Sequence, residues 1–151
     1  MKRLMVSLLA FLLFGAGCRP VGHDVGLYVQ LVCGSDRDGP PLPSARPTGA
    51  ELNSRLHQVF NHKHYWELKR DGIELREGQT ARRRVCADRD VEIELLKARQ
   101  MAVRIYDHGK LARSRTQPLE SAFFVSGWDQ GGGESWFIVV RRDRPVDPSL
   151  R

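Results

Sequence analysis

Apolar and polar residues alternate along much of the chain, and this alternation predicts β-strands. In the segment 26–33, Leu27, Val29, Leu31 and Cys33 fall on one face of an extended strand, and the residues between them fall on the other face. A period of two is typical of a strand in a sheet, so we expect the first strand here.

The alternation returns in short segments between residues 65 and 142. Turn residues separate these segments, which cover 65–75, 80–86, 91–95, 101–106, 111–116, 122–127 and 136–142. Asp71 and Gly72 predict a hairpin turn inside the first of them, and 107–110 predicts a second hairpin turn. The arginine-rich segment 80–86 predicts an edge strand, whereas the last two segments are the most apolar and predict central strands.

The segment between the first strand and residue 65 has a different character. Prolines and glycines in 34–49 predict a loop, because proline cannot donate a ladder hydrogen bond. In 50–60 the apolar residues recur at helical spacing and predict one buried stripe, made of Leu52, Leu56, Val59 and Phe60. Thr48 followed by Glu51 predicts a capping box at the start of this helix.

Several short strands, each with one solvent-exposed and one buried face, predict an antiparallel β-sandwich. We therefore expect a mainly β fold, with an immunoglobulin-like arrangement as one option, and one short helix near residues 50–60. A single domain at 25–146 would hold this fold, and 147–151 would form a C-terminal tail.

The N-terminal residues have the layout of a signal peptide. Lys2 and Arg3 are followed by the apolar run 4–14 and by small residues, which predicts a signal peptide at 1–17. The apolar run is too short for a permanent membrane span, which needs about 20 residues. We therefore expect an exported chain.

The sequence GAGC, which ends at Cys18, resembles the lipobox of bacterial lipoproteins. This resemblance implies that Cys18 becomes lipidated and anchors the chain to a bacterial membrane, facing the periplasm or the outside, with 18–24 as a short tether. The alternative is ordinary secretion. Beyond the signal, the chain resembles small envelope lipoproteins in its general pattern, with no specific family indicated.

The charge of the chain is only mildly basic. It has 24 Lys and Arg against 18 Asp and Glu, and removal of Lys2 and Arg3 with the signal leaves 22 against 18, a net charge of +4. Arg82, Arg83 and Arg84 form the densest cationic run. Because an exported protein rarely meets nucleic acid, we interpret these arginines as solvent-facing strand residues and expect no nucleic-acid partner.

Two cysteines remain after Cys18. An oxidising compartment favours a disulfide between Cys33 and Cys86. The strand pattern argues against it, because Cys33 shares a face with apolar residues and Cys86 shares one with arginines. The sequence leaves this pairing open.

Histidines gather at positions 57, 62 and 64, but they make a weak metal-binding pattern. His57 lies off the predicted helical stripe, and no cysteine adjoins the group. We interpret His57, His62 and His64 as surface or interface residues, and expect no metal and no cofactor.

The segment 128–136 is the strongest candidate binding loop. Trp128 and Trp136 flank three consecutive glycines, and Asp129 and Glu134 lie between them. A phosphate-binding glycine loop leads into a helix, but a strand follows these glycines, so the sequence does not predict a phosphate site here. Paired tryptophans can instead contact a sugar or an apolar peptide; the alternative is a flexible hairpin whose tryptophans pack in the core.

The sequence contains no pattern that calls for an enzyme. Ser121, Ser126 and Ser135 lack a nucleophile-elbow motif, and Glu92 and Glu94 share the wet face of one strand. We therefore expect a noncatalytic, membrane-tethered accessory or binding module of the bacterial envelope, with an envelope protein or glycan as partner. The alternatives are a carbohydrate- or peptidoglycan-contacting sandwich and a small envelope hydrolase.

Overall fold

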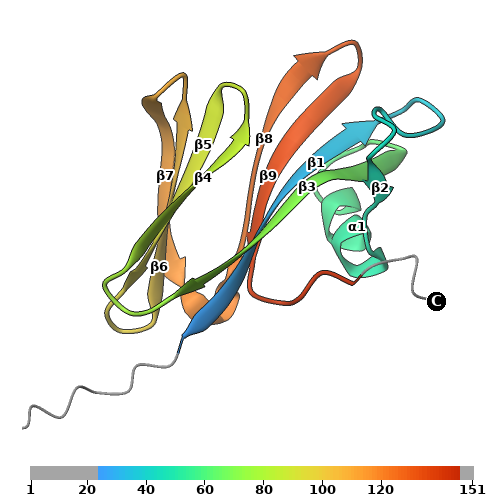
Figure 1. Cartoon of the computed structure of the whole chain (residues 1–151). Helices are drawn as coiled ribbons and strands as arrows, with labels where there is room; N and C mark the ends of the chain where they lie inside the picture. The colour runs from blue at the N-terminus through green and yellow to red at the C-terminus, as the bar shows by residue number, and fades with distance from the viewer. Residues whose placement is uncertain (1–23, 147–151) are drawn as a thin grey trace, which may run out of the picture.

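A computed structural model describes residues 24–146, which form two antiparallel β-sheets and one short helix (Figure 1). The first sheet has the strand order β2-β3-β1-β9-β8, with bounds β1 Val25–Ser35, β2 Arg46–Pro47, β3 His64–Leu75, β8 Phe123–Gly131 and β9 Glu134–Arg141. The second sheet has the order β4-β5-β6-β7, with bounds β4 Thr80–Cys86, β5 Arg89–Leu96, β6 Gln100–Asp107 and β7 Lys110–Pro118. The helix α1 covers Ala50–His57, and a single 3-10 turn covers Leu119–Ser121.

The two sheets pack face to face, and α1 covers the outer face of the five-stranded sheet (Figure 1). The predicted antiparallel sandwich with one short helix is therefore confirmed. None of the helices in residues 24–146 has the length and apolar character needed to cross a membrane.

β1 is the central strand of the five-stranded sheet, and apolar residues on both of its faces are buried. Leu27, Val29 and Leu31 enter the core between the sheets, whereas Val32 enters a second core beneath α1. That second core consists of Val32, Leu52, Leu56, Tyr65, Phe137 and Val139. Burying a side chain of this size stabilises the fold by roughly 1.5–3 kcal/mol, so both faces of β1 contribute.

The helix is shorter than the sequence pattern predicts, and it starts differently. Leu52 and Leu56 are buried as expected, but α1 ends at His57, and the Val59 side chain is 73% exposed. The N-cap is Gly49 without a side-chain hydrogen bond, so the predicted capping box is wrong. Thr48 instead continues the pairing of β2 with β3, since its N–H donates to the Tyr65 carbonyl at 3.1 Å.

The predicted turn at Asp71 and Gly72 is also wrong, because β3 runs through both residues without a break. Asp71 pairs with Val29 and Gly72 pairs with Tyr28 across the β1–β3 ladder. A Cβ at Gly72 would lie 3.8 Å from the Tyr28 ring, which is ordinary van der Waals contact, so this position does not require glycine. The second predicted turn is confirmed: His108 and Gly109 have φ angles of 49° and 77°, as a tight hairpin requires.

Strand order corrects two further expectations. β4 is an edge strand and β9 is central, as predicted, but β8 is the outer strand of its sheet. A tight hairpin joins β8 to β9, and no described strand pairs with the other side of β8. The second sheet is an uninterrupted meander of β4 to β7, which differs from the immunoglobulin strand order. Short turns keep these successive strands in one sheet.

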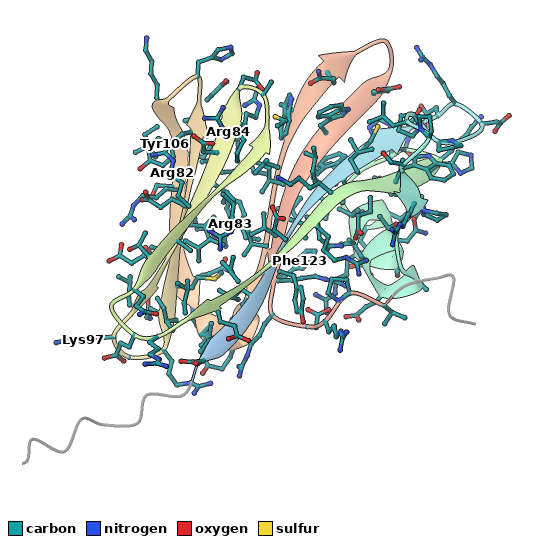
Figure 2. The ribbon with its side chains drawn as sticks, viewed as in Figure 1. Arg82, Arg83, Arg84, Lys97, Tyr106 and Phe123 are labelled. Atoms are coloured by element: carbon teal, nitrogen blue, oxygen red, sulfur yellow. The ribbon has the colours of Figure 1, made fainter. Side chains whose placement is uncertain are left out.

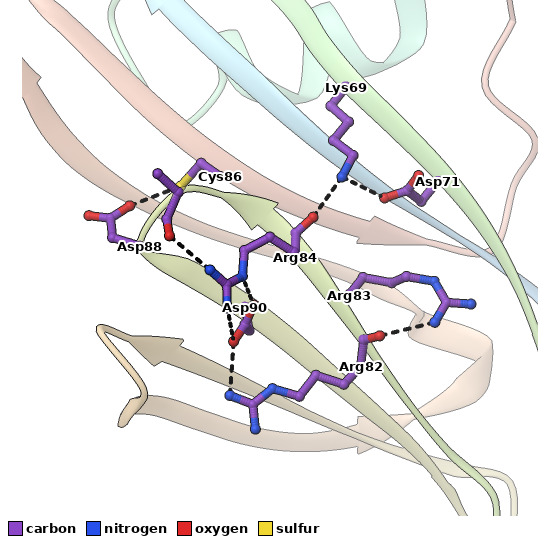
Figure 3. A network of polar contacts seen from close by, with 9 residues as sticks. Lys69, Asp71, Arg82, Arg83, Arg84, Cys86, Asp88 and Asp90 are labelled. Carbon is purple, nitrogen blue, oxygen red and sulfur yellow. Dashed lines mark hydrogen bonds and ion pairs between the residues drawn. The ribbon is translucent and has the colours of Figure 1, made fainter.

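The arginines of β4 divide between the two faces of the edge strand. Arg82 and Arg84 both bind the Asp90 carboxylate of β5, and Arg82 also stacks on Tyr106, with its guanidinium 4.1 Å from the ring centre (Figures 2 and 3). Burial alone would raise the pKa of the Asp90 carboxyl, but these guanidinium groups lower it below its usual value. Arg83 shares a face with buried Val91, an inward charge that discourages edge-to-edge pairing.

A buried polar layer lies on the face of the first sheet that α1 covers. Gln30 donates to Glu67, and Arg70 binds the same carboxylate at 2.9 Å. Arg141 is 3% exposed and ion-paired with Asp143 at 3.2 Å, yet its Nε and Nη1 atoms make no hydrogen bond within residues 24–146. Burial lowers the pKa of Arg141, so this arginine is held at a cost in desolvation.

Candidate functional site

Trp128 and Trp136 are strand residues and do not belong to a loop. They face each other across the β8–β9 ladder, with ring centres 6.3 Å apart and planes at 61°. Only Gly132 and Gly133 lie between the two strands, and both have positive φ angles, 65° and 81°. The interpretation of 128–136 as a binding loop is therefore wrong in its local structure, because the glycines make a compact hairpin.

The two acidic residues of this segment support the hairpin. Asp129 Oδ1 accepts a hydrogen bond from the Gly131 N–H at 2.8 Å. Glu134 lies 3.6 Å from Arg37, and a second guanidinium nitrogen of Arg37 donates to the Gly132 carbonyl at 2.9 Å. Asp129 and Glu134 thus have structural partners, which makes them weaker candidates for ligand contact than the tryptophans.

Both tryptophans are half-buried against the core between the sheets. The guanidinium of Arg89 lies 4.1 Å from the Trp128 ring centre, so one face of this ring is covered. Trp128 Nε1 donates to Gln130 at 2.9 Å, whereas Trp136 Nε1 is buried without a hydrogen-bond partner in the part of the chain described.

A cavity of about 250 Å³ lies beside Trp128, between β8 and the four-stranded sheet. We call it the β7–β8 cleft; it is lined by Arg89, Ile105, Asp107, Ala112, Arg113, Ser126, Gly127 and Trp128. The sheets lean apart towards the β8–β9 hairpin (Figure 1), and nearly every residue of edge strand β7 is exposed. The cleft is therefore open to solvent along β7.

Some of the arginines around the cleft are ion-paired and others are not. Arg89 is ion-paired with Asp107 at 3.1 Å. Arg113 lies opposite the buried Ile105 in the β6–β7 ladder, so it shares the inner face of the sheet. Arg113 and Arg115 make no ion pair within residues 24–146. Such a cleft combines an aromatic wall with free positive charge, and it suits a ligand that carries both apolar and anionic groups.

A larger hollow of about 580 Å³ lies near the start of β8. Its lining includes Arg55, which is already ion-paired with Glu51 and stacked over the Phe123 ring at 4.7 Å. Its lining contains no tryptophan, cysteine or histidine. Of the four binding candidates that the sequence marks, Trp128 lines the smaller cleft, and Asp129, Glu134 and Trp136 are not in its lining.

The three histidines that the sequence groups together do not form a metal-ligand cluster within residues 24–146, although His57 and His62 both contact Tyr65. His57 packs edge-on against Tyr65 at 4.9 Å, and His64 lies 3.6 Å from Asp38. His62 Nε2 lies 3.0 Å from Ser135 Oγ, and the ring covers Gly34 so closely that a Cβ there would clash at 2.6 Å.

Ser135, His62 and Asp36 stand in the order of a hydrolase triad. However, Asp36 Oδ1 is 3.7 Å from His62 Nδ1, and that oxygen already accepts from the Lys63 N–H at 2.9 Å. Asp36 is also 57% exposed, whereas the orienting carboxylate of a triad is buried. Ser135 lies inside β9 and is paired with strands on both sides, so its neighbouring amides serve the ladder and not an oxyanion hole. We interpret the contact as structural.

The acid pair of β5 is likewise explained by packing. Glu92 and Glu94 both bind Arg104, at 3.1 and 2.8 Å, and Tyr106 donates to Glu92 at 3.3 Å. Two carboxylates shared by one guanidinium form an ion-pair network on the outer face of the sheet.

Cys33 and Cys86 are both free thiols, so the structure does not form the disulfide that the sequence left open. Cys33 is fully buried, and burial together with the nearby Glu134 raises its pKa to about 11. Cys86 is half-buried, and its Sγ lies 3.1 Å from Asp88 Oδ1. Cys18 lies outside the described residues.

The sequence interpretation missed the part of the site that the second sheet supplies. Arg89, Asp107 and Arg113 line the cleft, and Asp88 and His108 lie beside it. The order of the predicted strands could have indicated this part of the site. In a meander, alternate turns lie at the same end of the sheet, so the turn before Arg89 lies next to the turn after Asp107.

Comparison with protein families, curated proteins and solved structures finds no match for this chain.

Proposed function

We propose that this protein is a noncatalytic binding module, held at a bacterial membrane by a lipid on Cys18 and contacting an envelope partner through the β7–β8 cleft. The observation that carries the binding role is the cleft itself, an opening of about 250 Å³ with Trp128 on one wall and Arg113 on another. The lipobox-like sequence GAGC supports the anchor.

The chemistry of the cleft favours a protein partner over a glycan. A sugar that stacks on tryptophan needs a free ring face, but Arg89 covers one face of Trp128, and the ring also packs against the core between the sheets. Trp136 offers less, because its Nε1 is buried. An acidic segment of a protein could place a carboxylate near Arg113 and an apolar side chain against Trp128.

The tether limits where the partner lies. Residues 18–24 reach about 3.3–3.6 Å per residue when extended, so the domain stays near the bilayer. Two or more acyl chains hold such a domain stably, whereas a single chain binds only marginally. The partner is therefore a membrane protein or a component close to the membrane surface.

Fractionation of Cys18→Ser tests the anchor. We expect the variant to move from the membrane fraction to the soluble envelope fraction, because it lacks the lipid attachment point. A correctly processed Cys18→Ser chain that stays with the membrane would contradict the anchor. Cys33→Ser is the matched control, since Cys33 is buried and free, and it should remain in the membrane fraction.

A further inference from the structure

Among the outer strands of the two sheets, β7 presents the most exposed edge. β2 has only two residues, and Phe124 and Ser126 of β8 are 6% and 7% exposed. In β4, the Asp90 carboxylate holds Arg82 and Arg84. Eight of the nine residues of β7 are exposed, and the strand lies at the outer side of the four-stranded sheet (Figure 1). Its outward backbone N–H and C=O groups have no strand to pair with within residues 24–146.

Every charged side chain of β7 is cationic. Lys110, Arg113 and Arg115 are exposed, and none of them forms an ion pair in the described part of the chain. Arg113 lies opposite the buried Ile105, and Arg115 lies opposite the buried Val103, so both arginines leave β7 on the face that looks toward the first sheet. Because the sheets lean apart there, this face of β7 is open to solvent (Figure 1).

These cations decide which kind of strand can add to the edge. Two copies of β7 paired antiparallel would bring their Arg113 and Arg115 side chains to one face, where like charges repel. A strand with carboxylates at alternate positions would instead place them beside Arg113 and Arg115, since side chains two residues apart share a face. The edge therefore favours an acidic strand over a second copy of the chain.

The regular part of this edge covers residues 113–117. A bulge at Ala112 interrupts the β6–β7 ladder on one side, and Pro118, which lacks an N–H, ends it on the other. Ser114 and Thr116 alternate with the two arginines and lie on the opposite face. Small hydroxyl side chains of this kind pair well with threonine across two strands. The segment thus offers one cationic face and one polar, uncharged face to an incoming strand.

We propose that residues 113–117 of β7 accept an extended segment of the envelope partner as an added β-strand, with carboxylates at alternate positions facing Arg113 and Arg115. In strand addition, main-chain hydrogen bonds supply affinity and alternate side chains supply specificity. This inference rests on the proposed function, because it describes how the acidic segment at the β7–β8 cleft is bound. It adds that the segment is extended and continues the four-stranded sheet.

A synthetic peptide that alternates glutamate and threonine tests the proposal on the full chain in detergent. By fluorescence anisotropy, it should bind more tightly than a peptide of the same composition with its glutamates and threonines in two blocks, because only alternation puts the carboxylates on one face. Arg113→Glu should weaken binding at least about tenfold, since like charges then face each other. Arg83→Glu is the matched control: Arg83 is an exposed arginine on the other edge of the same sheet, opposite buried Val91, and its substitution should leave binding unchanged.

Hydrogen exchange measured by NMR distinguishes an added strand from a loose electrostatic contact. When the alternating peptide binds, the unpaired amides of residues 113–117 should become protected, because they then donate to the peptide backbone. Three results would each overturn the proposal: equal affinity of the two peptides, unchanged exchange of the β7 amides, and equal loss of binding in Arg83→Glu and Arg113→Glu. Protection of the same amides by dimerisation of the unmodified chain without peptide would assign the edge to a second copy and would also overturn it. None of these results decides the cleft contact itself, which crosslinking from Ala112 in native envelopes tests separately.

Discussion

Arg89 and Trp128 join the two sheets of the sandwich, with the guanidinium of Arg89 on β5 lying 4.1 Å from the ring centre of Trp128 on β8. Arg89 is also ion-paired with Asp107, so the stacked guanidinium is held in place from its own sheet. This contact forms a wall of the β7–β8 cleft and limits how far the sheets separate there.

The Arg89–Trp128 contact should stabilise the fold measurably. In a double-mutant cycle with Arg89→Met and Trp128→Leu, we expect a coupling of about 1 kcal/mol in the free energy of unfolding, typical of a partly buried cation–π contact. Denaturant unfolding of the four proteins gives this value. Strictly additive changes would show that the two side chains are neighbours without an energetic interaction.

Cys33 should make the stability of the fold depend on alkaline pH. Burial raises the pKa of its thiol from 9.0 to about 11. A group whose pKa is higher in the folded chain contributes fully below the unfolded value and loses its contribution as the pH rises through the folded value. The free energy of unfolding should therefore fall between pH 9 and 11, by about 3 kcal/mol at most from this residue.

Comparison with Cys33→Ala isolates this effect from other groups that titrate in the same range. The stability of the variant should fall less steeply above pH 9 than that of the unmodified protein. Parallel pH profiles for the two proteins would mean that the Cys33 thiol titrates normally in the folded state.

Ser135 should be chemically inert despite its contact with His62. A fluorophosphonate probe labels serines that a base activates, and Ser135 lies within a paired strand without an oxyanion hole. We expect no label at Ser135 by mass spectrometry of the intact folded protein. Labelling that disappears in His62→Ala would instead establish an activated nucleophile and would contradict a noncatalytic protein.

Arg141 and Arg70 of the polar layer should respond to substitution in opposite directions. Arg141→Met should leave the free energy of unfolding unchanged or raise it by about 1–2 kcal/mol, because the Arg141 charge is buried at 3% exposure, and its ion-pair partner Asp143 is 41% exposed and can be solvated without it. Arg70→Met should lower it by about 1–3 kcal/mol, because buried Glu67 loses its ion-pair partner. A loss in Arg141→Met as large as in Arg70→Met would contradict this account.

The sequence pattern predicts the sandwich because alternation is a local property. Leu27, Val29 and Leu31 show it, and these residues enter the core as expected. The local pattern does not predict structure that depends on pairing between strands far apart in the sequence. The turn signal of Asp71 and Gly72 is overridden by the ladder that β3 forms along the whole of β1.

The candidate site was predictable only in part, for the same reason. Trp128 stands out by its residue type, and the structure places it in the cleft wall. Arg89, Asp107 and Arg113 come from another sheet, and an arginine in a strand looks the same in sequence whether it faces solvent or a cleft. Their place in the cleft lining depends on how the two sheets pack against each other, and the periodicity of the sequence does not predict that packing.

Site-specific photo-crosslinking in native envelopes tests the central claim, that the β7–β8 cleft contacts a partner. A crosslinking residue at exposed Ala112, on the cleft lining, should capture one discrete envelope protein, and the same residue at exposed Glu77, between β3 and β4, should not. Adding Arg113→Glu, an exposed change that reverses the free charge of the cleft, should abolish the capture from position 112. Equal capture from positions 112 and 77, or capture from 112 that persists with Arg113→Glu, would contradict the claim.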